Sequence, residues 1–193
     1  MAKKKRANIV PGLLLRLFGG LLFIISLSLL VEHAPGDHIK YYILPLLIVS
    51  LLLDIFDSKY EIYTSYFRHL KEKTAHFSSQ TYFLLGITLI LPYLDTRIVF
   101  IVAAMTLIGT IGGQMIREFY WKQIPLSPVI QGMLIAFLLN VCGGLVFVSS
   151  YLVIIPMAIT ATLIESFASS KEDNLLIPII AGMVGHIILT III

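Results

Sequence analysis

Three carboxylates gather between two apolar segments near the end of the chain. The stretch "ESFASSKEDNLLIPI" (165–179) holds Glu165, Glu172 and Asp173 within nine residues, although only 13% of the chain is charged. Ionisable residues inside apolar helices are costly and are usually functional. If the two segments form a helical hairpin, Glu165 faces Asp173 across its mouth. The pair then makes a hard oxygen site suited to Mg²⁺, which proteins hold with one or two carboxylates together with substrate phosphates.

A solvated turn is the simpler interpretation of the same residues. Asp173 or Asn174 can cap the first backbone N–H groups of the helix that follows, with Pro178 in or near its first turn. Glu172 is then a solvated neighbour. Capping does not explain Glu165. This residue therefore favours a metal site over a plain solvated turn.

The composition indicates an integral membrane protein. The chain has 193 residues, of which 58% are hydrophobic, and its mean hydropathy is +0.95. Apolar runs close to the ~20 residues needed to cross a bilayer recur along the whole sequence, so residues 1–193 form a single membrane domain. The one cysteine, Cys142, lies inside an apolar run, which excludes a disulfide framework and a cysteine-based metal site.

The apolar runs and their breakers predict an all-α bundle of about seven membrane-spanning helices. The expected ranges are 11–31, 39–56, 79–94, 98–116, 127–147, 150–167 and 174–193. No charge marks the turn between the fifth and sixth helices. Six spans therefore also fit, with these two as one bent element.

The distribution of basic residues sets the orientation. With the N-terminus in the cytoplasm, the inner side receives twelve of the 14 Lys and Arg residues and the outer side only Lys40 and Arg97. The inner side then includes the basic N-terminus (1–10) and an amphipathic loop (57–78). This asymmetry explains the net charge of +3 without nucleic acid as a partner. The small size favours the cytoplasmic membrane of a prokaryote.

Basic side chains are expected on the same face as the three carboxylates. Arg117, Lys122 and Lys171 are placed to neutralise the phosphates of a nucleoside triphosphate. Two glycine-rich stretches, 109–113 and 142–144, are interpreted as close-packing sites rather than phosphate loops, because neither follows a strand or carries a Lys-Ser/Thr pair.

The C-terminal motif resembles that of a known family. Glu165 followed by "DNLLIPI" (173–179) is similar to the signature of the CTP-dependent lipid kinases, which include dolichol, phytol and diacylglycerol kinases. The segment "TYFLLG" (81–86), with a charged stretch before it, resembles the start of a span in that family. The similarity extends over roughly residues 45–185 in the same order.

The resemblance implies an all-helical membrane enzyme that transfers the γ-phosphate of CTP to the hydroxyl of a polyprenol, dolichol or diacylglycerol-like lipid at the cytoplasmic face. Asp173 and Asn174 would belong to the nucleotide and Mg²⁺ site, and Glu165 would support it. The partners implied are the bilayer, a lipid alcohol and a nucleoside triphosphate.

Two elements of the family pattern differ in this chain. Thr110 stands where the family has the Asp of a Gly-Asp pair, and Gln131 replaces the Glu of a Gly-Lys-Ser/Thr-x-Glu-Gly element that here also lacks its Lys. Either Arg117, Glu118 and Lys122 rebuild the site, or the protein is a catalytically inactive relative that binds lipid or a membrane partner. A transporter is a weaker alternative, because polar residues gather at one face rather than at the midplane.

Overall fold

The structure is a computed structural model. It describes residues 39–60, 77–109, 128–148, 150–168 and 172–192, together with five residues further upstream: Phe18, Leu22, Ile25, Ser26 and Leu29. Within these residues the regular structure is helical and no strand occurs. The predicted all-α class is therefore confirmed.

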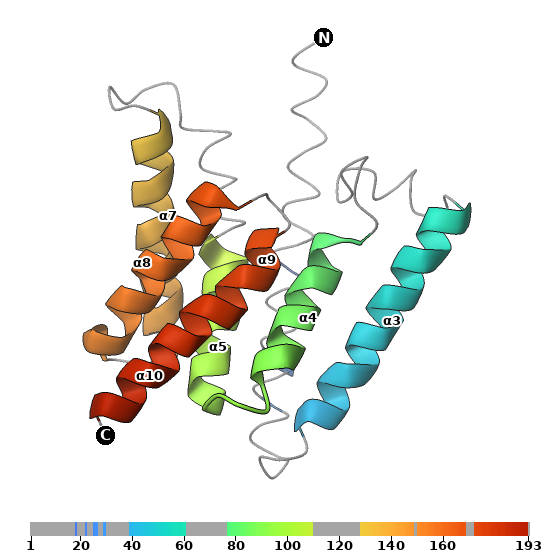
Figure 1. Cartoon of the computed structure of the whole chain (residues 1–193), viewed down its shortest axis with the longest axis horizontal. Helices are drawn as coiled ribbons and strands as arrows, with labels where there is room; N and C mark the ends of the chain where they lie inside the picture. Colours follow the sequence, from blue (N-terminus) through green and yellow to red (C-terminus); the bar gives the residue numbers. More distant parts are fainter. Residues whose placement is uncertain are drawn as a thin grey trace.

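The described helices run up and down through one bundle (Figure 1). Their order is α3 (Ile39–Tyr60), α4 (Ser79–Ile90), α5 (Thr96–Ala104), η2 (Met105–Gly109), α7 (Pro128–Leu145), α8 (Tyr151–Phe167), α9 (Glu172–Leu176), η3 (Ile177–Ala181) and α10 (Gly182–Ile192). The segments η2 and η3 are π-helical turns. The first continues α5, and the second joins α9 to α10 in one helix.

These helices follow the ranges predicted from the apolar runs. Five described residues in the predicted range 11–31 are helical and exposed. Of the range 98–116, residues 98–109 are helical and the rest lies outside the described residues, as do residues 1–10 and 61–76. The first four residues of the predicted loop 57–78 belong to α3, which extends to Tyr60.

The uncharged stretch after residue 140 contains a true turn. Gly144 is the last glycine of α7, and its carbonyl accepts hydrogen bonds from the N–H groups of Phe147 and Val148 at 3.1 and 3.3 Å. The next helix begins at Tyr151, and α7 and α8 pack side by side. The fifth and sixth predicted elements are therefore two helices rather than one bent helix.

The core of the bundle is built around α5. Every residue from Ile98 to Ala104 is buried, and α5 packs against α7, α10 and η3. Glycines allow the surrounding helices to approach closely. A Cβ at Gly86 would lie 3.1 Å from the carbonyl oxygen of Leu175, so α4 and α9 are in near-backbone contact.

Proline and the π-turn coincide in the last helix. Pro178 lies inside it, where proline lacks an N–H donor and crowds the preceding turn. The wider π-turn η3 accommodates this defect. Asp173 and Asn174 lie in the first described turn of this helix, and the expected capping role of either residue stays a prediction.

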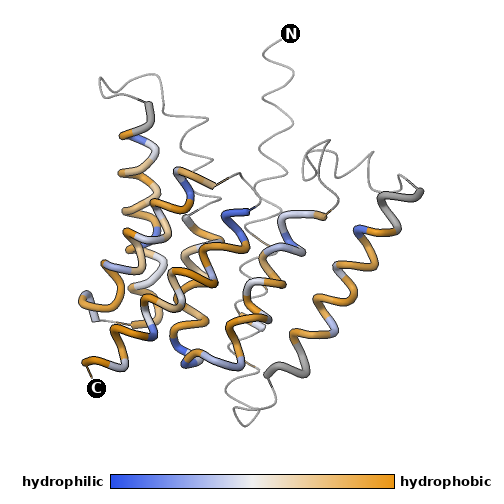
Figure 2. Tube along the Cα trace, in the orientation of Figure 1, coloured by the Kyte–Doolittle hydropathy of each residue, from blue (hydrophilic) through white to orange (hydrophobic). Residues whose placement is uncertain are grey.

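One described helix has the length and apolar composition to cross a membrane by itself, namely the helix Glu172–Ile192. The other apolar helical stretches among the described residues are shorter: Ile43–Ile55 within α3, Ser79–Ile90, Thr96–Gly109, Ile130–Leu145 and Tyr151–Phe167. The middle of each helix is strongly apolar, and the polar residues lie mainly near the helix ends (Figure 2).

A buried carboxylate holds α3 against α4. Asp54 Oδ2 accepts hydrogen bonds from the Ser78 N–H (2.8 Å) and from the Thr81 hydroxyl (2.6 Å). Ser50 and Thr81 share a further hydroxyl contact of 2.6 Å, and the Ser78 hydroxyl caps the start of α4. Asp54 is only 8% exposed, so these bonds compensate for the burial of its charge.

Replacing this carboxylate should weaken the bundle. Asp54→Ala leaves the Ser78 N–H and Thr81 hydroxyl without their acceptor, and we expect a loss of about 2 kcal/mol, seen as a lower melting temperature in detergent. Asp95→Ala is the control, because Asp95 is an exposed cap of α5 and its loss costs less. Equal melting temperatures for Asp54→Ala and wild type would contradict this role.

Candidate functional site

Four helix ends lie on the same side of the bundle. The ends of α3 and α8 and the starts of α4 and α9 all lie on the upper side in Figure 1, whereas the turn between α4 and α5 lies on the opposite side. Glu165 is near the end of α8, and Glu172 and Asp173 open α9. The structure therefore places the three carboxylates at the same end of the bundle.

Glu165 turns toward the inside of the bundle. The residue is half-buried, and its Oε2 atom is shielded from solvent. Its Oε1 atom lies 2.9 Å from the position that a Cβ would take at Gly109, the last residue of η2. Glycine at this position therefore leaves room for the carboxylate beside the π-turn.

Asn140 of α7 reaches the same place. Its side chain occupies the position that a Cβ on Gly109 would need. Only glycine at position 109 therefore leaves room for the Asn140 amide. Asn140 is fully buried, and its Nδ2 donates to the Thr162 hydroxyl at 3.4 Å. One amide, one carboxylate and one hydroxyl from two helices thus converge on η2.

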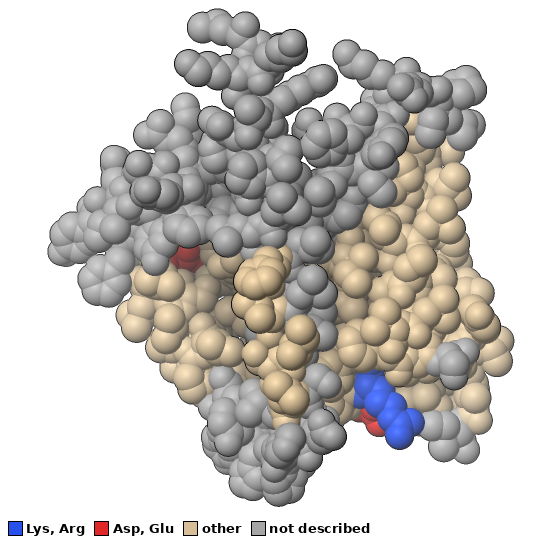
Figure 3. All heavy atoms as spheres, turned by 180° about the vertical axis from the view of Figure 1, so that it is seen from behind, with Lys and Arg blue, Asp and Glu red and all other residues tan. Residues whose placement is uncertain are grey.

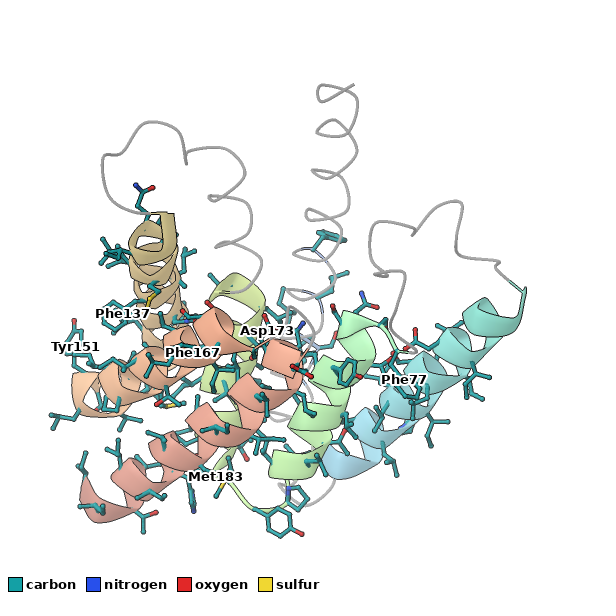
Figure 4. All side chains as sticks on the ribbon, turned by 45° about the horizontal axis from the view of Figure 1, so that its top comes forward. Phe77, Phe137, Tyr151, Phe167, Asp173 and Met183 are labelled. Atoms are coloured by element: carbon teal, nitrogen blue, oxygen red, sulfur yellow. The ribbon has the colours of Figure 1, made fainter. Side chains whose placement is uncertain are left out.

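Asp173 is the most buried of the three carboxylates. It is 5% exposed, and its Oδ1 atom is shielded from solvent. Figure 4 shows it at the start of α9, between the ends of α8 and α4, and α9 contacts both of these helices. Asn174 beside it is half-buried, whereas Glu172 is exposed, as expected of a solvated neighbour.

The structure places two residues of the predicted site at the same end of the bundle. Glu165 and Asp173 both lie inside the bundle at its upper end, and Glu165 has Asn140 and Gly109 as neighbours. The predicted phosphate-binding residues Arg117, Lys122 and Lys171 lie outside the described residues, and their roles stay predictions. Among the described side chains, no three of the types His, Cys, Asp and Glu cluster as metal ligands.

The donors present fit a magnesium ion. Carboxylate and amide oxygens are its preferred protein ligands, and one or two of them suffice when phosphates complete the shell. Near Gly109 one oxygen of each kind is present, from Asn140 and Glu165. Magnesium binding by Glu165 together with Asp173 stays a prediction from the sequence.

Sequence reasoning missed Asn140, Thr162 and Gly109 as parts of the site. Gly109 was interpreted as a packing residue, and its close contact with α7 and α8 confirms this, but it also makes the room for two polar side chains. A buried amide within an apolar run was the available signal, since Asn140 is surrounded by apolar neighbours in the sequence.

Comparison with known proteins gives no relative. No family model, curated protein or solved structure matches this chain. The resemblance to the lipid kinases therefore remains a prediction from the short motifs themselves.

A single methyl group tests the geometry around Gly109. In Gly109→Ala the new Cβ collides with Asn140 and crowds Glu165, so we expect a loss of about 2 kcal/mol in stability, or a displaced Asn140. The matched control is Gly143→Ala, whose Cβ would make an ordinary 3.4 Å contact with the Ala104 backbone. Melting curves in detergent that show equal stability for both variants would contradict the close convergence at Gly109.

Proposed function

We propose that the chain is a multi-pass membrane protein whose N-terminus and carboxylate-bearing end face the cytoplasm. Large apolar side chains on the outer sides of α3, α7, α8 and α10 support this proposal. They include Leu44, Ile48, Leu52, Ile130, Leu134, Leu138, Ile155, Ile159, Leu163, Met183 and Ile187, all more than 40% exposed. Apolar area on this scale on several neighbouring helices fits contact with lipid.

The arrangement of charge and the helix lengths support the same proposal. The described surface in Figure 3 is almost without charge over its middle, and charged groups lie toward its edges. With a rise of about 1.5 Å per residue, α3 with 22 residues and the last helix with 21 are each roughly 30 Å long. This length matches a hydrocarbon core of ~30 Å.

The reaction that fits this site best is the transfer of the γ-phosphate of CTP to the hydroxyl of a membrane lipid such as a polyprenol, dolichol or diacylglycerol. The single observation that carries the proposal is the burial of Asp173 and Glu165 at one end of an apolar bundle. Placing carboxylates there costs free energy, so they are expected to have a function. Binding the metal of a cytosolic nucleotide next to a lipid hydroxyl is such a function.

In phosphoryl transfer the protein contributes mainly by positioning the reactants and neutralising their charge. In the proposed reaction the lipid hydroxyl oxygen bonds to the γ-phosphorus and gives up its proton to water. The bond from this phosphorus to the β–γ bridging oxygen breaks, and CDP leaves with the electron pair of that bond. Asp173 and Glu165 would hold the Mg²⁺ that binds the phosphates, because carboxylates repel phosphate oxygens unless a cation lies between them. Asn174 would add a polar contact. A bound Mg²⁺ would supply positive charge to the phosphate oxygens.

A catalytically inactive, lipid-binding relative is the second candidate. Gln131, which stands where the family has Glu, is buried on α7 at 4% exposure. A neutral amide at this position cannot carry the negative charge of the family residue. This substitution and Thr110 favour a protein that keeps the scaffold without the reaction.

Phosphate transfer is measured directly with the purified protein in lipid–detergent micelles. With γ-labelled CTP, Mg²⁺ and a panel of polyprenols and diacylglycerols, we expect label in the lipid fraction. Asp173→Asn should lower the rate by about a hundredfold, because the Mg²⁺ would lose a carboxylate ligand. Glu172→Gln, which changes an exposed carboxylate, should leave it unchanged. A folded wild type that transfers no label to any alcohol points to the second candidate.

Cysteine labelling tests the membrane topology independently of activity. In a Cys142→Ala background, Tyr93→Cys places a thiol on the turn between α4 and α5, where Tyr93 is 79% exposed, and Glu172→Cys places one at the opposite end. A membrane-impermeant maleimide should label the first from outside intact cells, and the second only in inverted vesicles. Labelling of both from the same side would rule out the proposed arrangement.

A further inference from the structure

The amide oxygen of Asn140 is a buried acceptor in the middle of an apolar helix. The side chain is fully buried, yet its Oδ1 has no hydrogen-bond partner in the part of the chain that the structure describes. Leaving a buried acceptor in this state is unfavourable, and such atoms in native proteins commonly mark an unseen water or ion.

The hydrogen bonds of Thr162 decide which way the amide faces. The Thr162 hydroxyl donates its hydrogen to the Ala158 carbonyl at 2.7 Å, so it can only accept from Asn140. It therefore needs the Nδ2 group on its side, as observed at 3.4 Å. A flipped amide would place two acceptors against each other. The oxygen of Asn140 must then face Gly109.

A second acceptor oxygen lies close to Gly109 and to the Asn140 amide. Glu165 Oε1 lies 2.9 Å from the Cβ position at Gly109, the same position that the Asn140 amide oxygen overlaps. An amide oxygen and a carboxylate oxygen thus approach one point from α7 and α8. That point lies on the π-turn η2, a form of helix that is frequent at functional sites.

We propose that Asn140 Oδ1 and the Glu165 carboxylate together bind one divalent metal cation beside Gly109, and that Asn140 is a metal ligand outside the C-terminal motif. The proposed function enters this inference at one point only: it identifies the cation as the Mg²⁺ that accompanies the nucleotide. The binding itself follows from the buried amide oxygen and the carboxylate next to it.

The exposure of the site favours a divalent ion that keeps part of its water shell. Asn140 is sealed, whereas Glu165 is half-buried and borders the end of the bundle. Mg²⁺ dehydrates reluctantly and is usually held by few protein oxygens, with water and phosphate as the other ligands. One sealed amide oxygen and one carboxylate at the mouth provide such a partial shell.

The test measures metal binding without nucleotide or lipid. Mn²⁺, a spin-active substitute for Mg²⁺, is titrated into the full-length protein in detergent, and the free ion is followed by electron paramagnetic resonance. Asn140→Leu keeps a similar volume without the oxygen and should weaken binding at least about tenfold. Asn140→Asp keeps an oxygen and adds charge, so it should bind as tightly as wild type or more tightly.

Controls separate the site from general charge and from folding. Glu165→Gln should weaken binding like Asn140→Leu, whereas Glu172→Gln, on the exposed side of α9, should not change it. Circular dichroism and gel filtration establish that each variant is folded. If Asn140→Leu unfolds, the Mn²⁺ affinities of Asn140→Ser and Asn140→Asp are compared with that of the wild type instead.

The outcomes for this site and for the kinase reaction differ. Mn²⁺ binding that depends on Asn140 and is displaced by Mg²⁺ supports the inference even if no phosphate is transferred to lipid. Affinity that is equal in wild type and in folded Asn140→Leu overturns it, as does displacement of Mn²⁺ by Na⁺ as readily as by Mg²⁺ at equal ionic strength.

Discussion

The structure depends on how an apolar bundle accommodates carboxylates. A charge removed from water costs several kcal/mol unless donors or a counter-charge compensate for it. The described carboxylates accordingly lie at the ends of the helices, and those that turn inward have polar groups arranged around them. Asp54 shows the compensated case, with a backbone N–H and a hydroxyl on one of its oxygens.

Two polar clusters at the same end of the bundle differ in their hydrogen-bond balance. Between α3 and α4, donors from Ser78 and Thr81 match the acceptor Asp54, and the cluster holds two helices together. Between α7, α8 and η2, the oxygens of Asn140 and Glu165 both approach Gly109, and the Asn140 oxygen has no hydrogen-bond donor among the described residues. The first balance suits a structural role. The second suits the binding of a positive ion.

The helices were predictable from the sequence, because apolar runs and their breakers fix where an apolar helix begins and ends. The site was predictable only in part. Glu165 and Asp173 were identified from their cost inside apolar segments, and both are at least partly buried at one end of the bundle. The π-turns and the meeting of Gly109, Asn140 and Thr162 depend on the packing of helices far apart in the sequence. Asn140 and Thr162 are separated by 22 positions, so spacing along one helix could not reveal their contact.

The most direct test of the account is the position of a metal ion in a crystal of the protein grown in a lipid mesophase and soaked with Mn²⁺. Anomalous scattering locates the ion without reference to activity. The account predicts a peak about 2 Å from oxygens of Asn140 and Glu165, beside Gly109. Peaks confined to exposed residues, with none at this point in a well-ordered crystal, would contradict it.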